Sequence, residues 1–127
     1  MNDSIIGSEL RKRLRDWVPA GEDEYACRVE FDPAFTGFEG HFPGNPIVPG
    51  VCLVELARVM AENAVGRPLT MKEITTCKFR RPVQAGMTAD CKLQVRRPDD
   101  SVVLIQAEIR VGDSPAGQIR MKAEIGS

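Results

Sequence analysis

The most apolar stretch of the chain follows a loop rich in proline and glycine. From Gly50 onward, apolar side chains fall on nearly every helical direction, and Gly66 and Pro68 then mark an end. A helix that is apolar all round is a buried one. The pattern therefore predicts a buried helix from Gly50 to about Ala64.

Strands are predicted on both sides of this helix. Before it, apolar and polar residues alternate over 25–31, which is typical of a strand with one buried face. After it, turn signals separate four further strand-like runs, at 71–79, 89–96, 102–111 and 118–125. The connections are too short for crossover helices, so we expect neighbouring strands to pair antiparallel as hairpins.

The N-terminal segment, about residues 1–20, predicts a short amphipathic helix. Between Ser4 and Trp17, apolar residues recur at helical spacing with a basic run between them, and a breaker follows at 19–21. We interpret the basic run as the solvated face of this helix.

Together these elements predict an α+β fold. One long central helix, wrapped by a curled antiparallel sheet of about five strands, is a hot-dog arrangement. A single sheet cannot cover a helix that is apolar all round, so its remaining side must meet loops or another subunit, which favours a dimer. With 127 residues, 43% of them hydrophobic, and no linker or repeat, we expect one domain over residues 1–127.

Composition narrows the partners and the location. The formal net charge of −1 gives no overall attraction to nucleic acid or to an acidic membrane. No apolar run approaches the ~20 residues that cross a bilayer, and the N-terminus lacks the pattern of a secretory signal. The four cysteines are singly spaced, which argues against a zinc site. We predict a cytoplasmic protein with no metal, no nucleic-acid partner and no membrane span.

Two features are unusual for a plain structural domain. The only histidine, His41, lies in the stiff stretch 40–50, where proline and glycine fix the backbone and let a ligand approach it. The apolar run after that stretch holds a single acid within 51–61, Glu55. Because a buried carboxylate costs several kcal/mol, Glu55 must be paired, protonated or next to an opening.

These residues carry a resemblance to a known family. Gly40-His41-Phe42-Pro43-Gly44-x-Pro46-x-x-Pro49-Gly50-Val51, with Glu55 fourteen positions after His41, resembles the active-site signature of the β-hydroxyacyl-acyl-carrier-protein dehydratases of the FabZ and FabA type. A second block, Phe79-Arg80-Arg81-Pro82-Val83-x-x-Gly86, is similar to the same family.

The resemblance implies a hot-dog fold and the reversible loss of water from a 3-hydroxyacyl thioester, giving a trans-2-enoyl thioester. It implies no metal or redox cofactor, and a substrate carried on the phosphopantetheine of an acyl carrier protein. It also implies a homodimer whose active sites take histidine from one subunit and acid from the other. Some family members stack three dimers into a hexamer.

The chemistry of dehydration gives these residues roles. His41 is the expected base for the proton on C2, since an unperturbed imidazole has a pKa near ~6.5 and is mostly neutral in the cytosol. We expect apolar surroundings to keep Glu55 protonated, as the acid that protonates or orients the leaving hydroxyl. An ion pair between Glu55 and Arg58 is the less favoured interpretation.

Substrate and carrier contacts follow from the same motifs. We expect Gly50 to donate its backbone N–H to the thioester oxygen, because the first amides of a helix lack internal partners. Val51, Phe42 and Pro43 are the other expected substrate contacts. A docking site for an acidic carrier protein is expected at a basic cluster, which comprises Lys78, Arg80 and Arg81, with Arg96 and Arg97 as further candidates.

The chain departs from the family pattern in three places. The usual N-terminal block is not present, and Ala85-Gly86-Met87 stands where Pro-Gly-Asp is typical. Arg58-Val59 replaces the small residue and the glutamine that commonly follow the catalytic acid, which removes a hydrogen bond to that acid. These differences indicate a divergent member.

Two alternatives stay open. A hot-dog acyl thioesterase would use a carboxylate to activate water, and a non-catalytic carrier-binding subunit would keep the fold without turnover. The sequence leaves undetermined the acyl chain length, the pathway, the choice between carrier protein and coenzyme A, and the choice between dimer and hexamer.

Overall fold

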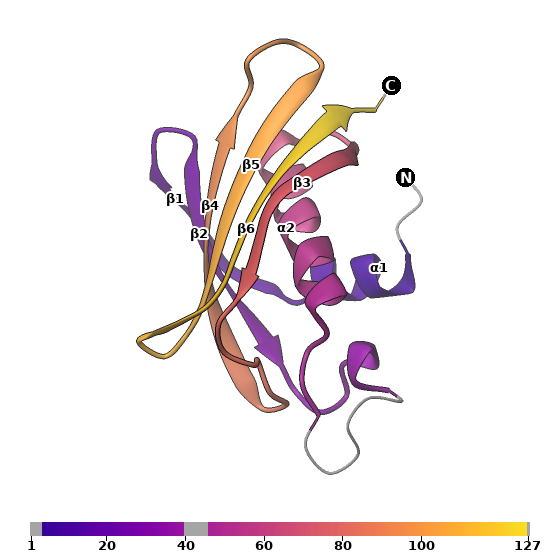
Figure 1. Ribbon diagram of the computed structural model, residues 1–127, viewed down its shortest axis with the longest axis vertical. Helices are drawn as coiled ribbons and strands as arrows, with labels where there is room; N and C mark the ends of the chain where they lie inside the picture. Colours follow the sequence, from indigo (N-terminus) through magenta and orange to yellow (C-terminus); the bar gives the residue numbers. More distant parts are fainter. Residues whose placement is uncertain (1–3, 40–45, 127) are drawn as a thin grey trace.

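The structure is a computed structural model that describes residues 4–39 and 46–126 (Figure 1). These residues form a six-stranded sheet, two α-helices and a short 3-10 helix. In chain order the elements are α1 (Ile5–Lys12), β1 (Leu14–Gly21), β2 (Glu24–Phe31), η1 (Thr36–Phe38), α2 (Gly50–Val65), β3 (Leu69–Phe79), β4 (Met87–Arg96), β5 (Val102–Val111) and β6 (Ser114–Ile125).

Helix α2 lies between the curled sheet and α1 (Figure 1). It buries residues on several sides, including Leu56, Ala57 and Met60, none of which is exposed. Gly66 ends the helix in the left-handed conformation (φ 75°), with its N–H donating to the carbonyl of Glu62 at 2.8 Å. The predicted buried helix and its glycine stop are thus confirmed.

All strands of the sheet pair antiparallel, in the order β1-β2-β4-β5-β6-β3. The five predicted strands are present as β2 to β6, and the sheet with its central helix confirms the α+β hot-dog arrangement. The predicted strand number was wrong, since six strands form. The predicted N-terminal helix forms in part, as α1, which packs as a second layer on α2.

The sixth strand, β1, occupies part of the predicted N-terminal helix. That helix ends at Lys12, and Leu14 and Trp17 belong to the strand instead. A β-bulge lies between Arg15 and Val18, and Asp16 has a left-handed φ of 54°. Because the bulge inserts one residue, Leu14 and Trp17 are both half-buried in the strand although they are three residues apart. A spacing of three is also typical of one face of a helix, which explains the wrong prediction.

Strand β3 does not form the expected hairpin with β4. It pairs with β6 at the edge of the sheet, and β5 and β6 lie between it and β4. Residues 80–86 make this crossing. Seven residues reach at most about 23 Å, and three strand spacings are only roughly 14 Å, so a short connection need not be a hairpin.

The outer edge of β3 carries no partner strand among the described residues. Most side chains of this strand are exposed, and Ile74 and Phe79 are 44% and 45% exposed. An edge with unpaired N–H and C=O groups and exposed apolar side chains is a surface on which another strand can pair. No helix of the described residues is long and apolar enough to span a membrane.

Candidate active site

Glu55 lies on the side of α2 that faces α1. Its side chain is 23% exposed, and Oε1 accepts hydrogen bonds from Nε of Arg58 at 2.9 Å and from Nη2 of the same guanidinium. Gly7 of α1 is so close that a Cβ there would lie 2.8 Å from Oε1. The less favoured interpretation, an ion pair with Arg58, is therefore the one that the structure shows, because residues three apart share a helix face.

The deeply buried acid of α2 is Glu62, which the sequence analysis did not single out. Its side chain is 2% exposed and its carboxylate binds two guanidinium groups, those of Arg11 and Arg58. The N–H of Leu69 donates to its Oε2 at 2.8 Å. The sequence gives two weak signs that Glu62 is a buried, paired acid. It lies seven residues after Glu55, on the same helix face, and arginines are nearby.

The pKa of the Cys52 thiol is affected by burial and by the negative charge of Glu55. Burial raises the pKa of the Cys52 thiol, and the negative charges of Glu55 and Glu9 raise it further. The thiol therefore stays protonated and acts as a small apolar group. Glu9 lies on α1, so carboxylates of two elements converge on this end of α2.

A second part of the site is a hollow of about 310 Å³ at the N-terminus of α2. Its lining includes Gly50, the apolar residues Ile47, Leu53 and Phe79, and the basic residues Arg80 and Arg81. No hydrogen bond joins the amides of Gly50 and Val51 to other described residues, as expected for the first turn of a helix. The hollow thus combines apolar walls, free amides and positive charge.

The two sequence motifs meet at this hollow. The N–H of Val48 donates to the carbonyl of Val83 at 2.7 Å, and Ile47 forms an isolated bridge with Gln84. The crossing segment 80–86 is thereby held against the residues that lead into α2. Gly50 and Arg80, far apart in the sequence, line one hollow for this reason.

Gly50 is required for the approach of Phe79. A Cβ on Gly50 would lie 2.6 Å from the Phe79 ring, and one on Gly117 would lie 3.2 Å from it. The ring therefore lies over two residues that have no side chain. Any larger residue at position 50 would displace Phe79 and change the shape of the hollow.

The remaining predicted substrate contacts have different outcomes. His41, Phe42 and Pro43 lie outside the described residues. Val51 is described, and its side chain is 75% exposed on the first turn of α2.

Gly50 and Glu55 lie on different sides of α2. Five helical residues turn the chain by about 500°, so their directions differ by about 140°. Gly50 faces Phe79 and Glu55 faces Gly7 of α1. Within the described part of one chain, the hollow and the acid are therefore not brought together.

The predicted basic cluster is divided by the fold. Lys78, Arg80 and Arg81 lie near the end of β3, next to the hollow, whereas Arg96 and Arg97 follow the far end of β4. Through the strand pairings Phe79 lies level with Cys91 of β4, so Arg96 lies five residues, about 17 Å, further along the sheet and three strands, about 14 Å, across it. The inclusion of Arg96 and Arg97 in one docking cluster was wrong.

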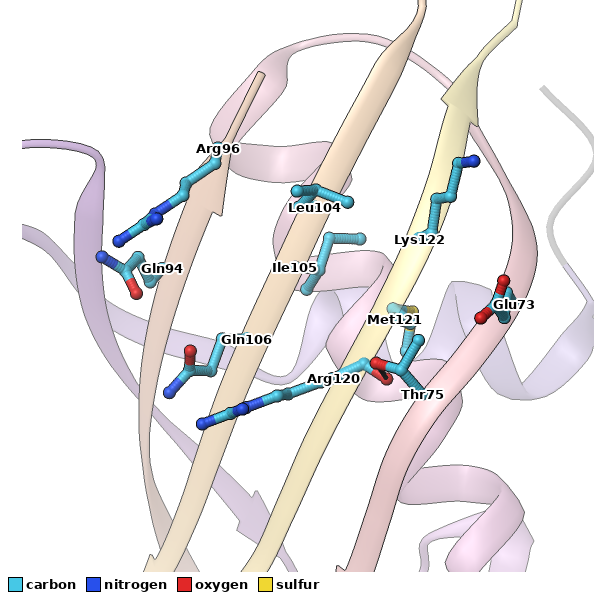
Figure 2. Close-up of a pocket in the computed structure, with 10 residues that line it drawn as sticks. All are labelled: Glu73, Thr75, Gln94, Arg96, Leu104, Ile105, Gln106, Arg120, Met121 and Lys122. Atoms are coloured by element: carbon cyan, nitrogen blue, oxygen red, sulfur yellow. Dashed lines mark hydrogen bonds between the residues drawn. The ribbon is translucent and has the colours of Figure 1, made fainter. Parts of the chain in front are cut away.

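Figure 2 shows another hollow, about 340 Å³, on the outer face of the sheet. Its side chains, among them Arg96, Arg120 and Lys122, stand on β4, β5, β6 and β3, with α2 behind the strands. The sheet separates these side chains from Glu55 and Gly50. We therefore place the candidate site at α2 and not in the outer hollow.

Comparisons with known proteins show which family the chain resembles. The ApeI-like family model, described as ApeI dehydratase, matches residues 18–111. The 3-hydroxyacyl-[acyl-carrier-protein] dehydratase FabZ of Campylobacter fetus is 34% identical over 101 residues, which cover 69% of this chain and 68% of the relative. FabZ of Caulobacter vibrioides is 27% identical over 97 residues, covering 69% of this chain. The chain spans about three fifths of that protein's length, 61%.

Solved structures share the fold. The dehydratase heterocomplex ApeI:P from Xenorhabdus doucetiae has a TM-score of 0.77 at 23% identity, covering 87% of this chain and 96% of that one. Zebra fish thioesterase superfamily member 2 has a TM-score of 0.72 at 13% identity, covering 98% and 89%. These two structures, one of a dehydratase complex and one of a thioesterase superfamily member, share the fold of this chain. The match over residues 18–111 confirms the resemblance and shows that the chain belongs to the ApeI-like dehydratase family.

Proposed function

We propose that the protein reversibly removes water from a 3-hydroxyacyl thioester bound to acyl carrier protein, giving the trans-2-enoyl thioester, in fatty-acid or related lipid or polyketide biosynthesis. The observation that carries this proposal is the hollow at the N-terminus of α2. It offers a separate partner for each part of such a substrate.

The free amides at Gly50 suit the thioester carbonyl, whose oxygen gains negative charge as the C2 proton leaves. The apolar residues Ile47, Leu53 and Phe79 suit an acyl chain. Arg80 and Arg81 suit the phosphate of a phosphopantetheine arm or the acidic surface of its carrier.

In the proposed reaction His41 removes the proton from C2, while Glu55 protonates or orients the hydroxyl that leaves C3. A C–H and a C–O bond break, a C=C bond forms, and water is released. Only protons and water move, so we propose that no metal or redox cofactor takes part. The role of His41 and the cytoplasmic location stay predictions from the sequence.

We further propose a homodimer with shared active sites. The open edge of β3 can pair with a second copy, and its exposed Ile74 and Phe79 would be covered there. Since Gly50 and Glu55 lie on different sides of α2 in one chain, a second chain would complete each site. Native mass spectrometry tests this and distinguishes a dimer from a trimer of dimers, and a monomer would contradict the shared site.

Turnover tests the reaction directly. The protein is incubated with 3-hydroxyacyl and trans-2-enoyl thioesters of acyl carrier protein, and hydration is followed in both directions. His41→Ala and Glu55→Gln should each lose activity by a factor of about 100 or more. Equal rates in the wild type and both variants would overturn the mechanism, and the same substrates on coenzyme A test the carrier.

Carrier docking is tested by reversing charge. Arg80→Glu/Arg81→Glu should raise KM for carrier-bound substrate about tenfold or more, with Lys78→Glu as a weaker single change. Arg96→Glu/Arg97→Glu is the matched control, because it reverses two exposed charges at the other end of the sheet. An equal effect of both double variants would remove docking from the hollow.

A thioesterase is the second candidate, and one observation favours it. Glu55 forms an ion pair with Arg58, and a carboxylate is a group that can activate water for attack on a thioester. Product analysis separates the two candidates, since a dehydratase gives an enoyl thioester and a thioesterase gives a free acid. Carrier binding without either product would identify a non-catalytic subunit.

A further inference from the structure

The two carboxylate oxygens of Glu55 differ in their hydrogen bonds. Both bonds from Arg58 end on Oε1, which also lies against Gly7 of α1. Oε2 accepts no hydrogen bond from the residues described. With 23% of the side chain exposed, one oxygen is held and the other remains available for a ligand.

A second ion pair, with Glu62, holds Arg58 in place. Its Nη1 donates to Oε2 of Glu62 at 2.7 Å, and its side chain is 14% exposed. Glu62 in turn is held by Arg11 of α1 and by the amide of Leu69. The guanidinium of Arg58 therefore cannot follow a moving Glu55 without breaking a buried ion pair, so it sets the position of Oε1.

Charged groups from α2 and α1 surround Glu55. Arg58 is the cation in direct contact, and on the same helix Cys52 has a raised pKa because of burial and then the charges of Glu55 and Glu9. From α1, Gly7 and Glu9 face this region, and Glu9 is itself neutralised by Arg13 at 3.0 Å. An adjacent guanidinium stabilises a carboxylate.

We propose that Arg58 is a positioning residue, which holds Glu55 as a carboxylate on Oε1 so that Oε2 accepts the hydrogen bond of the substrate's 3-hydroxyl. This role rests on the proposed function, in which Glu55 either protonates or orients the leaving hydroxyl, and it selects the second of these. Glu55 orients the hydroxyl and keeps no proton to give. The proton taken from C2 by the base is the one that reaches the hydroxyl as the C3–O bond breaks, and water leaves with the enzyme unchanged.

The chain supplies variants that separate positioning from stability. Arg58→Met removes the contact with Glu55 but also leaves Glu62 with fewer partners. Arg58→Met/Glu62→Gln removes both charges of that pair, while the amide oxygen can still accept from the N–H of Leu69 and from Arg11, whose side chain is 31% exposed. Replacing a buried ion pair by neutral groups of similar size is often neutral for stability.

We expect Arg58→Met to lower kcat about 10- to 100-fold with KM changed less than about threefold, because Glu55 acts on the reacting hydroxyl. The double variant should regain the wild-type urea midpoint and keep the low kcat. Arg58→Lys, which keeps the charge with a single nitrogen, should recover part of kcat.

Three results would overturn the role. One is a double variant that regains both the midpoint and kcat, which would make Arg58 structural only. Another is an Arg58→Met protein with wild-type kcat. A wild-type chain that neither hydrates enoyl thioesters nor dehydrates hydroxyacyl thioesters would overturn the proposed function itself, and this role with it.

Discussion

Glu55 and Glu62 are two acids on one face of α2, two helical turns apart, and they have opposite environments. Glu62 is 2% exposed, binds Arg11 and Arg58, and accepts the amide of Leu69. Glu55 is 23% exposed, and among the described residues only Arg58 donates to it, on one oxygen. The fully buried acid is thus fully neutralised, while the partly open acid keeps an oxygen for a ligand.

This difference shows what distinguishes a functional acid on such a helix. Burial alone would select Glu62, whose charge is already matched by two guanidinium groups and so has nothing left to offer a substrate. Unused hydrogen-bonding capacity selects Glu55. Since Arg58 touches both acids, the two roles are coupled through one side chain.

The largest effect should come from breaking the buried network. Glu62→Ala leaves Arg11 and Arg58 without their shared partner in a buried region, and we expect a loss of about 3–5 kcal/mol in the free energy of unfolding. Urea unfolding measures it. Glu124→Ala is the control, because Glu124 is 49% exposed and pairs with Lys72 at 3.5 Å. A Glu62→Ala protein as stable as the control would mean that the network contributes little.

Glu55→Gln should lower turnover and leave stability nearly unchanged. A partly exposed ion pair contributes less than about 1 kcal/mol, so the free energy of unfolding should hardly change, while turnover falls by a factor of about 100 or more. Urea unfolding and enoyl thioester hydration on the same preparation compare the two. A variant that loses stability and keeps turnover would exchange the roles of Glu55 and Glu62.

The sequence predicted the elements that depend on local patterns. The helix 50–64 has an apolar surface and a glycine stop, and the strands alternate clearly, so periodicity alone places them. The bulge at Asp16 broke that rule, because one inserted residue converts a strand spacing into a helical one. The position of β3 beside β6 also could not be predicted, since it depends on long-range pairing across the crossing segment.

For the site, the sequence named Gly50 and Arg80 separately, and the structure places both in the lining of one hollow. The environment of Glu55 was predicted wrongly. An apolar helix implies desolvation, but α1 brings Arg11 onto the same face, and with Arg11 on Glu62 the guanidinium of Arg58 extends to Glu55. Such a network arises from packing between α1 and α2, which periodicity within one helix does not report.

Gly7→Ala tests how α1 holds Glu55. The new Cβ would lie 2.8 Å from Oε1 of Glu55, an atom at the end of a flexible side chain, so the carboxylate should shift rather than the helices. Alanine also favours a helix over glycine by about 1 kcal/mol. We expect unchanged or slightly raised stability with turnover about tenfold lower, because Oε1 loses its place on Arg58.

The control for this change is Ser8→Ala, at the neighbouring position of α1. It should leave both turnover and the urea midpoint close to those of the wild type. If Gly7→Ala lowers stability strongly and leaves turnover intact, α1 moves instead of Glu55, and the contact has no role in positioning the acid.

The smallest effect concerns Glu9 and Asp32, the two acids that pair with Arg13 at the end of α1. Arg13 pairs with Asp32 at 2.8 Å and with Glu9 at 3.0 Å. Arg13, followed by the amide of Ala34, lowers the pKa of Asp32. For Glu9, burial raises the pKa, but bonds from Thr36 and Arg13 together outweigh it and the pKa is lowered.

Lowered carboxyl pKa values stabilise the fold above the ordinary pKa values of about 4, and this contribution is lost as the pH falls through the lowered values. Stability should therefore decrease between pH 5 and pH 3, and Arg13→Ala should decrease less over that interval. The stacking of Arg13 on Phe35, at 5.4 Å, is lost at every pH, so the change in urea midpoint between pH 5 and pH 3 isolates the ion pairs. Arg28→Ala, from an exposed pair with Asp90, should keep the wild-type pH dependence. An Arg13→Ala protein with the same decrease would mean that Glu9 and Asp32, unlike Glu62, contribute nothing through their charge.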